Sequence, residues 1–335
     1  MALHRVEDEA SREAAIGAAV AALAAGRLVA LPTETVYGLG ADATDGRAVA
    51  GIYAAKGRPS FNPLIAHVAD LAAAETHGIF SDDARKLAVA FWPGPLTLVV
   101  PKRPESAISD LATAGLDSVG LRVPAPEVTR AILARFGRPV AAPSANLSGR
   151  VSPTTAADVI DDLGPSVAEV IDTGPCPVGV ESTIVACLDG APMLLRPGGV
   201  AREALEAALG RPLADPAPTA CAGTADDPAS APLAPGMLSS HYAPRARVRL
   251  EATSVAAGEA LISFAGQRPP GSDTAAAIVD LSPSGDPAEA ASGLFRALRD
   301  LDATGAASIA VVPIPAVGLG EAIVDRLRRA AAPRP

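Results

Sequence analysis

The stretch LPTETVYGLGADATDGRAVAGIYAAKGRPSFNPLIAH, residues 31–67, sets the order of elements in the first part of this chain. The apolar run 27–31 predicts a short strand, which Pro32 ends because proline has no N–H to donate to a sheet. Residues 32–40 follow as a predicted loop that carries three hydroxyls and one carboxylate. Gly38 and Gly40 predict backbone angles in this loop that other residues rarely adopt.

A helix is predicted directly after the loop. Apolar residues recur at helical spacing over 45–56 and place Lys56 on the same face as themselves. Gly57 then ends the helix, so Lys56 and Arg58 lie close to the hydroxyl-rich loop. Two cations beside fixed hydroxyls suit a phosphate-bearing ligand. The same pair can also be a solvated one that the helix dipole favours.

Composition limits the class of protein. Of the 335 residues, 49% are hydrophobic and 19% are charged, which is typical of a globular chain. A net charge of −9 argues against extensive, nonspecific binding of nucleic acid. The three cysteines show no C-x-x-C spacing, which favours a reducing, cytoplasmic location. The apolar run 14–26 is too short to cross a membrane and lacks the basic start of a signal peptide.

Two later strands each carry one polar candidate. Residues 63–68 predict a strand that holds His67, which is either structural or a ligand contact. Residues 118–124 predict another, in which Arg122 points away from the alternating apolar side chains. Such an arginine either binds a carboxylate inside the protein or faces water at a sheet edge.

A loop rich in short polar side chains follows the predicted strand 139–142. Ser144 and Asn146 lie in this loop, and Ser152 precedes Pro153 at the start of a predicted helix. Loops at the carboxyl ends of strands are where open α/β sheets bind ligands, and these side chains suit phosphate oxygens. Turn formation explains Ser144 and Asn146 equally well, and helix capping explains Ser152.

The chain is predicted to contain two α/β domains. We expect a catalytic domain over 1–210, a Pro/Ala-rich linker over 211–246 and a small domain over 247–335. Predicted strands at 248–250, 260–264, 277–280 and 308–312 alternate with helices, which favours a Rossmann-like, partly parallel sheet. It has no G-x-G-x-x-G motif, so dinucleotide binding is not predicted. The linker's exit contains Met237, Leu238, His241 and Tyr242, which are apolar enough to pack on the first domain as a strap.

Several segments resemble the YrdC-type domain family of threonylcarbamoyl-AMP synthases. The similar segments are PTETVYGLGADA, KGRPSFNPLIAH, PSANLSG, GVESTIV and LLRPGG, with the PGM…HYAP segment typical of the family's two-domain form. The resemblance implies a twisted, mixed-sheet catalytic domain of the YrdC type. It implies synthesis of threonylcarbamoyl-AMP from L-threonine, bicarbonate and ATP, for modification of adenosine 37 of certain tRNAs. The product would pass to a tRNA threonylcarbamoyl transferase.

The resemblance also implies roles for individual residues. The catalytic set is Lys56, Arg58, Ser144 and Asn146. The ATP-binding set is Arg58, Asn62, Ser118, Ser144, Ser152, Arg196 and Tyr242. The L-threonine-binding set is Thr35, His67, Arg122, Ala142 and Ser182. No protein side chain is expected to bind a metal directly, because Mg²⁺ would arrive on the phosphates of ATP.

Two other functions fit the same type of domain. One is a noncatalytic RNA-binding module. The net negative charge argues against this function, although the same charge still allows weak contact with tRNA. The other is a carbamoyl-phosphate-using relative, as in hydrogenase maturation. Such relatives carry zinc-finger and acylphosphatase-like regions, and neither is visible in this sequence.

Overall fold

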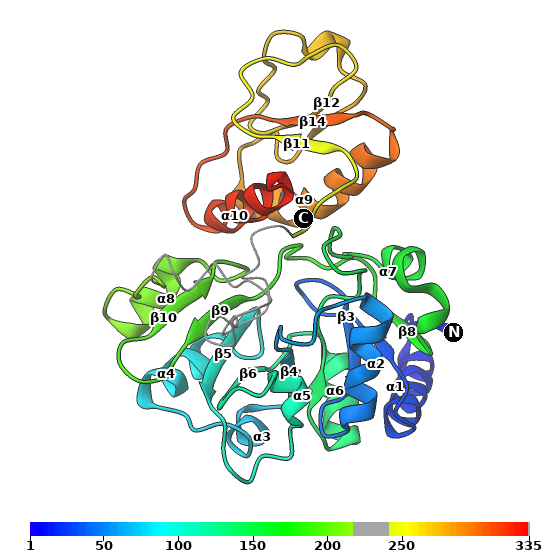
Figure 1. Ribbon diagram of the computed structural model, residues 1–335, viewed down its shortest axis with the longest axis vertical. Coiled ribbons are helices and arrows are strands. Elements are labelled where there is room, and N and C mark those ends of the chain that lie inside the picture. Colours follow the sequence, from blue (N-terminus) through cyan, green and yellow to red (C-terminus); the bar gives the residue numbers. More distant parts are fainter. Residues whose placement is uncertain (217–240, 334–335) are drawn as a thin grey trace.

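The computed structural model describes residues 1–216 and 241–333, which form two sheets with helices packed on them. Figure 1 shows the smaller, C-terminal unit stacked on the larger, N-terminal unit. Helices α9 (Pro287–Ala303) and α10 (Leu319–Ala331) lie between the small sheet and the N-terminal unit (Figure 1). The predicted fold class, a mixed-sheet α/β unit plus a smaller Rossmann-like unit, is confirmed.

The N-terminal unit is built on a ten-stranded sheet with the order β1-β8-β2-β3-β7-β4-β6-β5-β9-β10. The strands are β1 Ala2–Arg5, β2 Val29–Leu31, β3 Gly38–Asp42, β4 Ile65–His67, β5 Leu96–Pro101, β6 Ser118–Arg122, β7 Val140–Ala141, β8 Glu169–Asp172, β9 Thr183–Ala186 and β10 Met193–Arg196. Parallel and antiparallel neighbours alternate irregularly, so the sheet is mixed. Most strands are short, so the loops at their ends lie close together.

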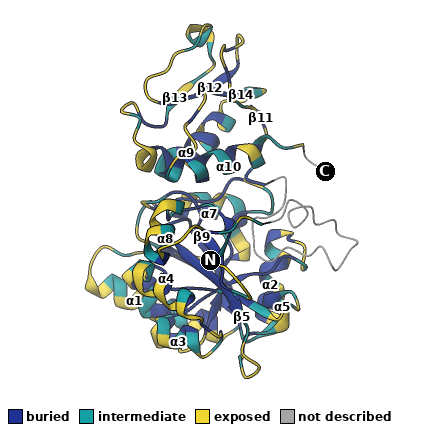
Figure 2. Cartoon of the chain, turned by 90° about the vertical axis from the view of Figure 1, so that its left-hand side faces the viewer, coloured by how far each residue is buried: buried dark blue, intermediate teal, exposed yellow. Residues whose placement is uncertain are grey.

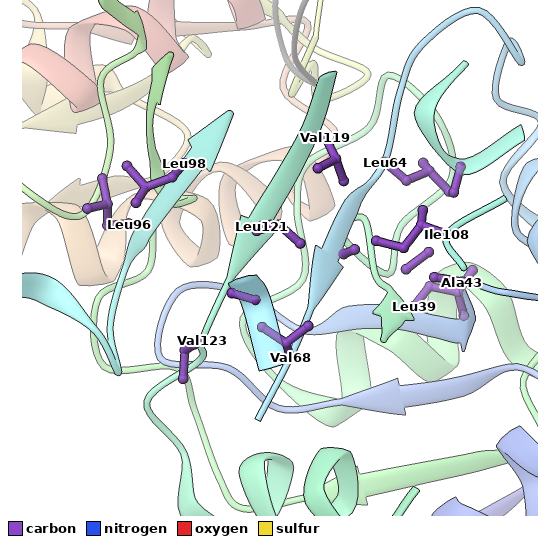
Figure 3. Close-up of a cluster of buried hydrophobic side chains, with 14 of the residues drawn as sticks. Leu39, Ala43, Leu64, Val68, Leu96, Leu98, Ile108, Val119, Leu121 and Val123 are labelled. Carbon is purple, nitrogen blue, oxygen red and sulfur yellow. The ribbon is translucent and has the colours of Figure 1, made fainter. Parts of the chain in front are cut away.

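Helices cover both faces of this sheet. They are α1 Glu9–Ala24, α2 Gly46–Lys56, α3 Leu71–Glu75, α4 Asp82–Phe91, α5 Asp110–Thr113, α6 Glu127–Phe136, α7 Ala156–Leu163 and α8 Arg202–Leu209. Alternation along β2 divides the core, since Val29 and Leu31 pack with α1 and α6 whereas Ala30 belongs to the main cluster. Figure 3 shows part of that main cluster. Figure 2 shows the buried strands beneath helices with exposed outer faces.

The C-terminal unit contains a wholly parallel sheet with the order β11-β14-β12-β13. Its strands are β11 Arg247–Arg249, β12 Ala260–Ser263, β13 Ile278–Asp280 and β14 Ser308–Val311. The prediction was a partly parallel sheet, whereas all neighbouring strands of this sheet are parallel. The apolar faces of α9 and α10 pack into one cluster with this sheet, and Val36, Val151 and Val180 of the N-terminal unit belong to the same cluster. The two units thus share a hydrophobic core.

The prediction for Gly38 and Gly40 was wrong. Both residues lie in β3, and neither has a positive φ angle. What they provide is close approach, because a Cβ built on Gly40 would lie 3.1 Å from the Leu31 Cδ1, the Val140 Cγ1 and the Val29 carbonyl oxygen. Glycine therefore lets neighbouring strands and their side chains pack tightly here.

Ser152 does not cap a helix, contrary to the prediction. Helix α7 begins at Ala156, and its N-cap is Thr155, which forms a capping box with Asp158. The Ser152 hydroxyl instead donates to the Glu181 Oε1 at 2.5 Å. The capping box satisfies the free N–H groups of the first turn, which leaves Ser152 available for this distant carboxylate.

Some predicted features lie outside the described residues. These are Cys221, Met237, Leu238 and most of the Pro/Ala-rich linker. Cys176 and Cys187 are both buried and form no disulfide. Within residues 1–216 and 241–333, no helix combines the length and apolar character needed to cross a bilayer.

Replacing Gly40 by alanine is expected to lower the free energy of unfolding by about 1–3 kcal/mol, because the added methyl overpacks the centre of the sheet. Gly17→Ala is the matched control. Gly17 is exposed in the middle of α1, and a Cβ there would meet nothing within 4 Å. The control should stabilise by about 0.5–1 kcal/mol. Urea unfolding measures both, and a Gly40→Ala protein as stable as the unsubstituted chain would contradict the close approach.

Candidate active site

One buried cavity collects most of the polar residues that the sequence singled out. It has a volume of about 50 Å³. Its lining consists of Thr35, Val36, Arg58, Ile65, His67, Arg122, Ala142, Pro143, Ser144, Glu181, Ser182, Arg196, His241 and Tyr242. Nine of these were predicted from the sequence. They come from segments far apart in the chain, so the fold is what brings them together.

Strand pairing sets the positions of several of these side chains. Strands β4 and β6 are parallel, and their register places His67 directly beside Arg122. Strands β9 and β10 form an antiparallel pair. Their pairing brings Arg196 to Ser182, whose carbonyl oxygen accepts from the Arg196 Nε at 3.2 Å and from its Nη2 at 2.8 Å. The Ser182 hydroxyl is also within 2.8 Å of the Thr97 hydroxyl.

Arg58 is buried, which does not fit the solvated alternative. Its Nη2 donates to the Pro63 carbonyl oxygen at 3.3 Å, and its buried Nε has no hydrogen-bond partner within the described structure. Burial lowers the pKa of Arg58 to about 10. A buried guanidinium with an unsatisfied N–H favours binding of an anion, which would supply both the charge and the acceptor.

Lys56 is also buried, but it does not line the cavity. Its ammonium donates to the carbonyl oxygens of Ser144 and Asn146, each at 2.5 Å. Burial, and then the nearby charge of Arg58, hold its pKa well below the ordinary value. Lys56 therefore fixes the loop that presents Ser144 to the cavity.

Arg122 faces the interior, as one of its two interpretations predicted. Its Nη2 donates to the Glu34 Oε1 at 2.7 Å and to the Thr35 hydroxyl at 3.0 Å. The other oxygen of Glu34 accepts from the Ala125 N–H at 2.9 Å. Glu34 thus compensates the buried charge of Arg122 and fixes the guanidinium at the cavity wall.

His67 is buried in the lining, and its Nδ1 has no hydrogen-bond partner among the described residues. Burial, and then the charge of Arg122, lower the pKa of His67 to about 3. The imidazole is therefore neutral at physiological pH. A neutral ring with one unsatisfied nitrogen can donate to or accept from a polar ligand.

Five predicted site residues do not line the cavity: Lys56, Asn62, Ser118, Asn146 and Ser152. The Oδ1 atoms of Asn62 and Asn146 are buried without hydrogen-bond partners in the described structure. Ser118 is half-buried at the opposite end of β6 from Arg122. These residues lie beside or behind the cavity, so the geometry brings together only part of the predicted set.

Sequence reasoning missed Glu181 and His241 as lining residues. Glu181 directly precedes the predicted Ser182. A carboxylate within an apolar strand segment indicates that the carboxylate has a buried partner, so the sequence did carry a signal. His241 precedes Tyr242 in the strap, and their ring centroids lie 4.1 Å apart. Both strap residues are buried.

A second cavity of about 980 Å³ lies on the other side of His241. Five aspartates and three arginines line it: Asp158, Asp161, Asp162, Asp300, Asp302, Arg150, Arg245 and Arg299. This excess of carboxylates repels a polyphosphate. The smaller cavity, with its arginines, is the better candidate for binding an anion.

Two family models match the chain. The first, described as "Telomere recombination", matches residues 21–198, and the second, described as "Threonylcarbamoyl-AMP synthase, C-terminal domain", matches residues 200–332. The chain belongs to the two-domain Sua5 family. The resemblance found in the sequence is thereby confirmed for both parts of the chain.

Individual Sua5-family relatives match over nearly the whole chain. The threonylcarbamoyl-AMP synthase of Bacillus subtilis is 40% identical and covers 98% of this chain and 96% of its own length. The threonylcarbamoyl-AMP synthase of Pyrococcus abyssi is 41% identical, and the match covers 91% of this chain and 90% of that protein. A crystal structure of Pyrococcus abyssi Sua5 with L-threonine superposes with a TM-score of 0.84 at 36% identity, covering 98% of this chain and 97% of that one.

The neutral, buried state of His67 predicts a pH dependence of stability. In the unfolded chain this histidine takes up a proton near pH 6.5, whereas in the folded chain it does so near pH 3. The unfolded form binds more protons in this window, so stability falls as the pH drops through it. Compared with His67→Gln, the unsubstituted protein should lose about 3 kcal/mol more between pH 7 and pH 4.

Urea unfolding of both proteins at several pH values measures this difference directly. The comparison isolates His67, because His77 and His241 titrate alike in the two proteins. Parallel pH profiles for the two proteins would show that the pKa of His67 is the same in the folded and unfolded chains.

Proposed function

We propose that this protein synthesises threonylcarbamoyl-AMP from L-threonine, bicarbonate and ATP, with release of pyrophosphate. The observation that carries this proposal is the convergence of Arg58, Arg122 and Arg196 on one buried cavity. Two separated anionic groups, a triphosphate and an amino-acid carboxylate, account for three arginines in so small a space. The reaction is the first step of N6-threonylcarbamoyladenosine formation in tRNA.

The reaction brings together three negatively charged groups: bicarbonate, the phosphates of ATP and the carboxylate of L-threonine. The amine of threonine adds to bicarbonate and loses water, which gives an N-carboxy-threonine. An oxygen of that carboxylate then attacks the α-phosphorus of ATP, and the bond to the β-phosphate oxygen breaks to release pyrophosphate. Because each partner is negatively charged, the protein must mainly position them and neutralise their charge.

For the nucleotide, we assign Arg58 and Arg196 to the phosphates. Both are buried at the cavity wall, and burial lowers the pKa of each. A neighbouring triphosphate would favour the charged form of both guanidiniums. Lys56 and Asn146 would act together with Ser144, since the Lys56 ammonium fixes the backbone of this loop.

The remaining predicted ATP contacts are Asn62, Ser118, Ser152 and Tyr242. Tyr242 lines the cavity, and the unpartnered Oδ1 of Asn62 suits a donor on the ligand. Ser152 is committed to Glu181, so we propose an indirect role for it. Ser118 would reach ATP only at the periphery of the site.

For the amino acid, we assign Arg122 to the carboxylate of L-threonine. Thr35 and Ser182 offer hydroxyls, and Ala142 and His67 complete this wall of the cavity. The unpartnered Nδ1 of His67 suits the threonine hydroxyl. Binding of L-threonine by the Pyrococcus abyssi protein supports this assignment.

Mg²⁺ would enter with ATP. No group of three or more His, Cys, Asp or Glu within residues 1–216 and 241–333 could hold a metal ion. The two carboxylates nearest the site, Glu34 and Glu181, already pair with Arg122 and Arg326. A metal held by phosphate oxygens fits these residues better than one held by the protein. Such an ion would neutralise charge on the phosphates.

Entry of ATP requires a rearrangement of the strap. The cavity of about 50 Å³ is far below the roughly 300–1,000 Å³ typical of small-molecule sites. His241 and Tyr242 form part of the cavity wall, and both are buried. We propose that these two residues move outward to admit the nucleotide and then pack against it.

Several broader features accompany this proposal. We propose that the product passes to a tRNA threonylcarbamoyl transferase, that contact with tRNA itself is weak, and that the protein works in the cytoplasm, where tRNA is modified. We divide the chain at residues 210 and 247, with the strap between the two domains. The two family models meet near residue 200, which supports a division in this region.

Neutralising Arg58 tests the proposed function. Arg58→Met should reduce threonine-dependent pyrophosphate release by about 100-fold or more, because it removes a buried charge from the phosphate site. Lys86→Met is the control, since Lys86 is 59% exposed on α4. The assay mixes protein, MgATP, L-threonine and bicarbonate. Pyrophosphate release that does not depend on L-threonine would refute the proposed reaction. Release by Arg58→Met at the rate of the unsubstituted protein would refute the role of Arg58.

Arg122 should affect L-threonine far more than ATP. Arg122→Met is expected to raise the KM for L-threonine by about tenfold or more, while the KM for ATP changes less than threefold. Steady-state kinetics with each substrate varied in turn separates the two. An equal rise in both KM values would place Arg122 outside the amino-acid site.

A further inference from the structure

One carboxylate of the cavity stands where a triphosphate would be repelled. Glu181 is buried and lines the cavity together with Arg58 and Arg196, the residues assigned to phosphate. Both of its oxygens are occupied. Oε1 accepts from the Ser152 hydroxyl at 2.5 Å, and Oε2 accepts from the Arg326 Nε at 2.6 Å.

Arg326 comes from the other unit of the molecule. It lies on α10, and its side chain is fully buried. Besides Glu181, its guanidinium donates to the Pro197 carbonyl oxygen at 3.0 Å and to Asp325. Its guanidinium carbon lies 5.1 Å from the ring centroid of Tyr242, within the range of a cation–π contact. Arg326 therefore touches the catalytic unit and the strap at the same point.

The charges explain why this contact matters for the nucleotide. An unpaired, buried carboxylate beside a triphosphate raises the free energy of the complex, and the low local dielectric strengthens the repulsion. Pairing with Arg326 cancels that charge and holds the carboxylate oxygen toward α10. The Ser152 hydroxyl holds the other oxygen in the same way.

We propose that Arg326 of the C-terminal unit is a positioning residue of the active site, which makes Glu181 compatible with bound ATP. This inference rests on the proposed function, because it takes the cavity to be the nucleotide site. It gives the C-terminal unit a defined part in the reaction. Arg326 acts through Glu181 and need not touch the substrate.

A second pair between the units provides a control on the same helix. Arg202 of α8 donates to Glu321 of α10 at 2.9 Å, and neither residue lines the cavity. If Arg326 only docked the two units, loss of the Arg202–Glu321 pair would have the same kind of effect. Glu321→Gln removes this pair and leaves the Glu181–Arg326 pair intact.

The experiment compares Arg326→Met, Glu181→Gln, the double variant and Glu321→Gln in the full-length protein. Calorimetric titration with MgATP gives the Kd, steady-state kinetics gives kcat and both KM values, and urea unfolding reports folding. Arg326→Met should weaken ATP binding by about tenfold or more, with the KM for L-threonine changed less than threefold. The double variant should bind ATP within about threefold of the unsubstituted protein, because Glu181 no longer carries a charge and Asp325 keeps its pair with Arg329.

The outcomes separate the two proposals. If the double variant binds ATP as weakly as Arg326→Met, or if Glu321→Gln weakens it equally, the role of Arg326 through Glu181 is overturned. If Arg326→Met does not fold, the double variant is compared with Glu181→Gln, and a tenfold weaker affinity of the double variant is decisive against the inference. If the unsubstituted protein binds ATP but shows no threonine-dependent turnover, the proposed function is refuted. The ATP affinities of the variants would still test the role of Arg326.

Discussion

Burying Lys56 and Arg58 without a carboxylate partner among the described residues is the constraint on which this structure depends. Lys56, Arg58 and Arg196 are all nearly inaccessible to water, and burial lowers the pKa of each. Main-chain carbonyl oxygens supply much of their hydrogen bonding. At Lys56 and Arg58 these dipoles compensate the charge only in part, so a nearby polyanion would favour the charged form of both.

The mixed sheet provides the geometry that this arrangement needs. Its short strands place loop residues, strand residues and the strap around one small volume, with His67 and Arg122 fixed in register on adjacent strands. The carboxylate of Glu34 anchors one arginine, and that of Glu181 anchors another from the far unit. Carboxylates of the protein thus match Arg122 and Arg326, whereas Arg58 has no carboxylate partner in the described structure.

The sequence predicted those features that depend on neighbours in the chain. The helical spacing up to Lys56 and the alternation around Arg122 both follow from local rules. Ser152 was misread because its partner, Glu181, lies 29 residues away. Arg326 gave no local signal at all, since a basic residue near the end of an amphipathic helix is ordinary, and its partner is 145 residues distant.

The same distinction explains the error at Gly38 and Gly40. A glycine pair after a proline suggests unusual backbone angles, but here the reason for glycine is the neighbouring strand, which becomes adjacent only after folding. Candidate site residues were recognised where polar side chains followed apolar strands. The place of His241 in the cavity wall depends on how the strap packs, so it could be located only in three dimensions.

The shared core of the two units restricts how this protein could have evolved. Val36, Val151 and Val180 pack in the cluster of the C-terminal unit, and Glu181 takes its counter-charge from that unit. A deletion of the C-terminal unit in an ancestor would have exposed an apolar surface and left a bare carboxylate in the site. Gain or loss of this unit therefore requires compensating substitutions at these positions.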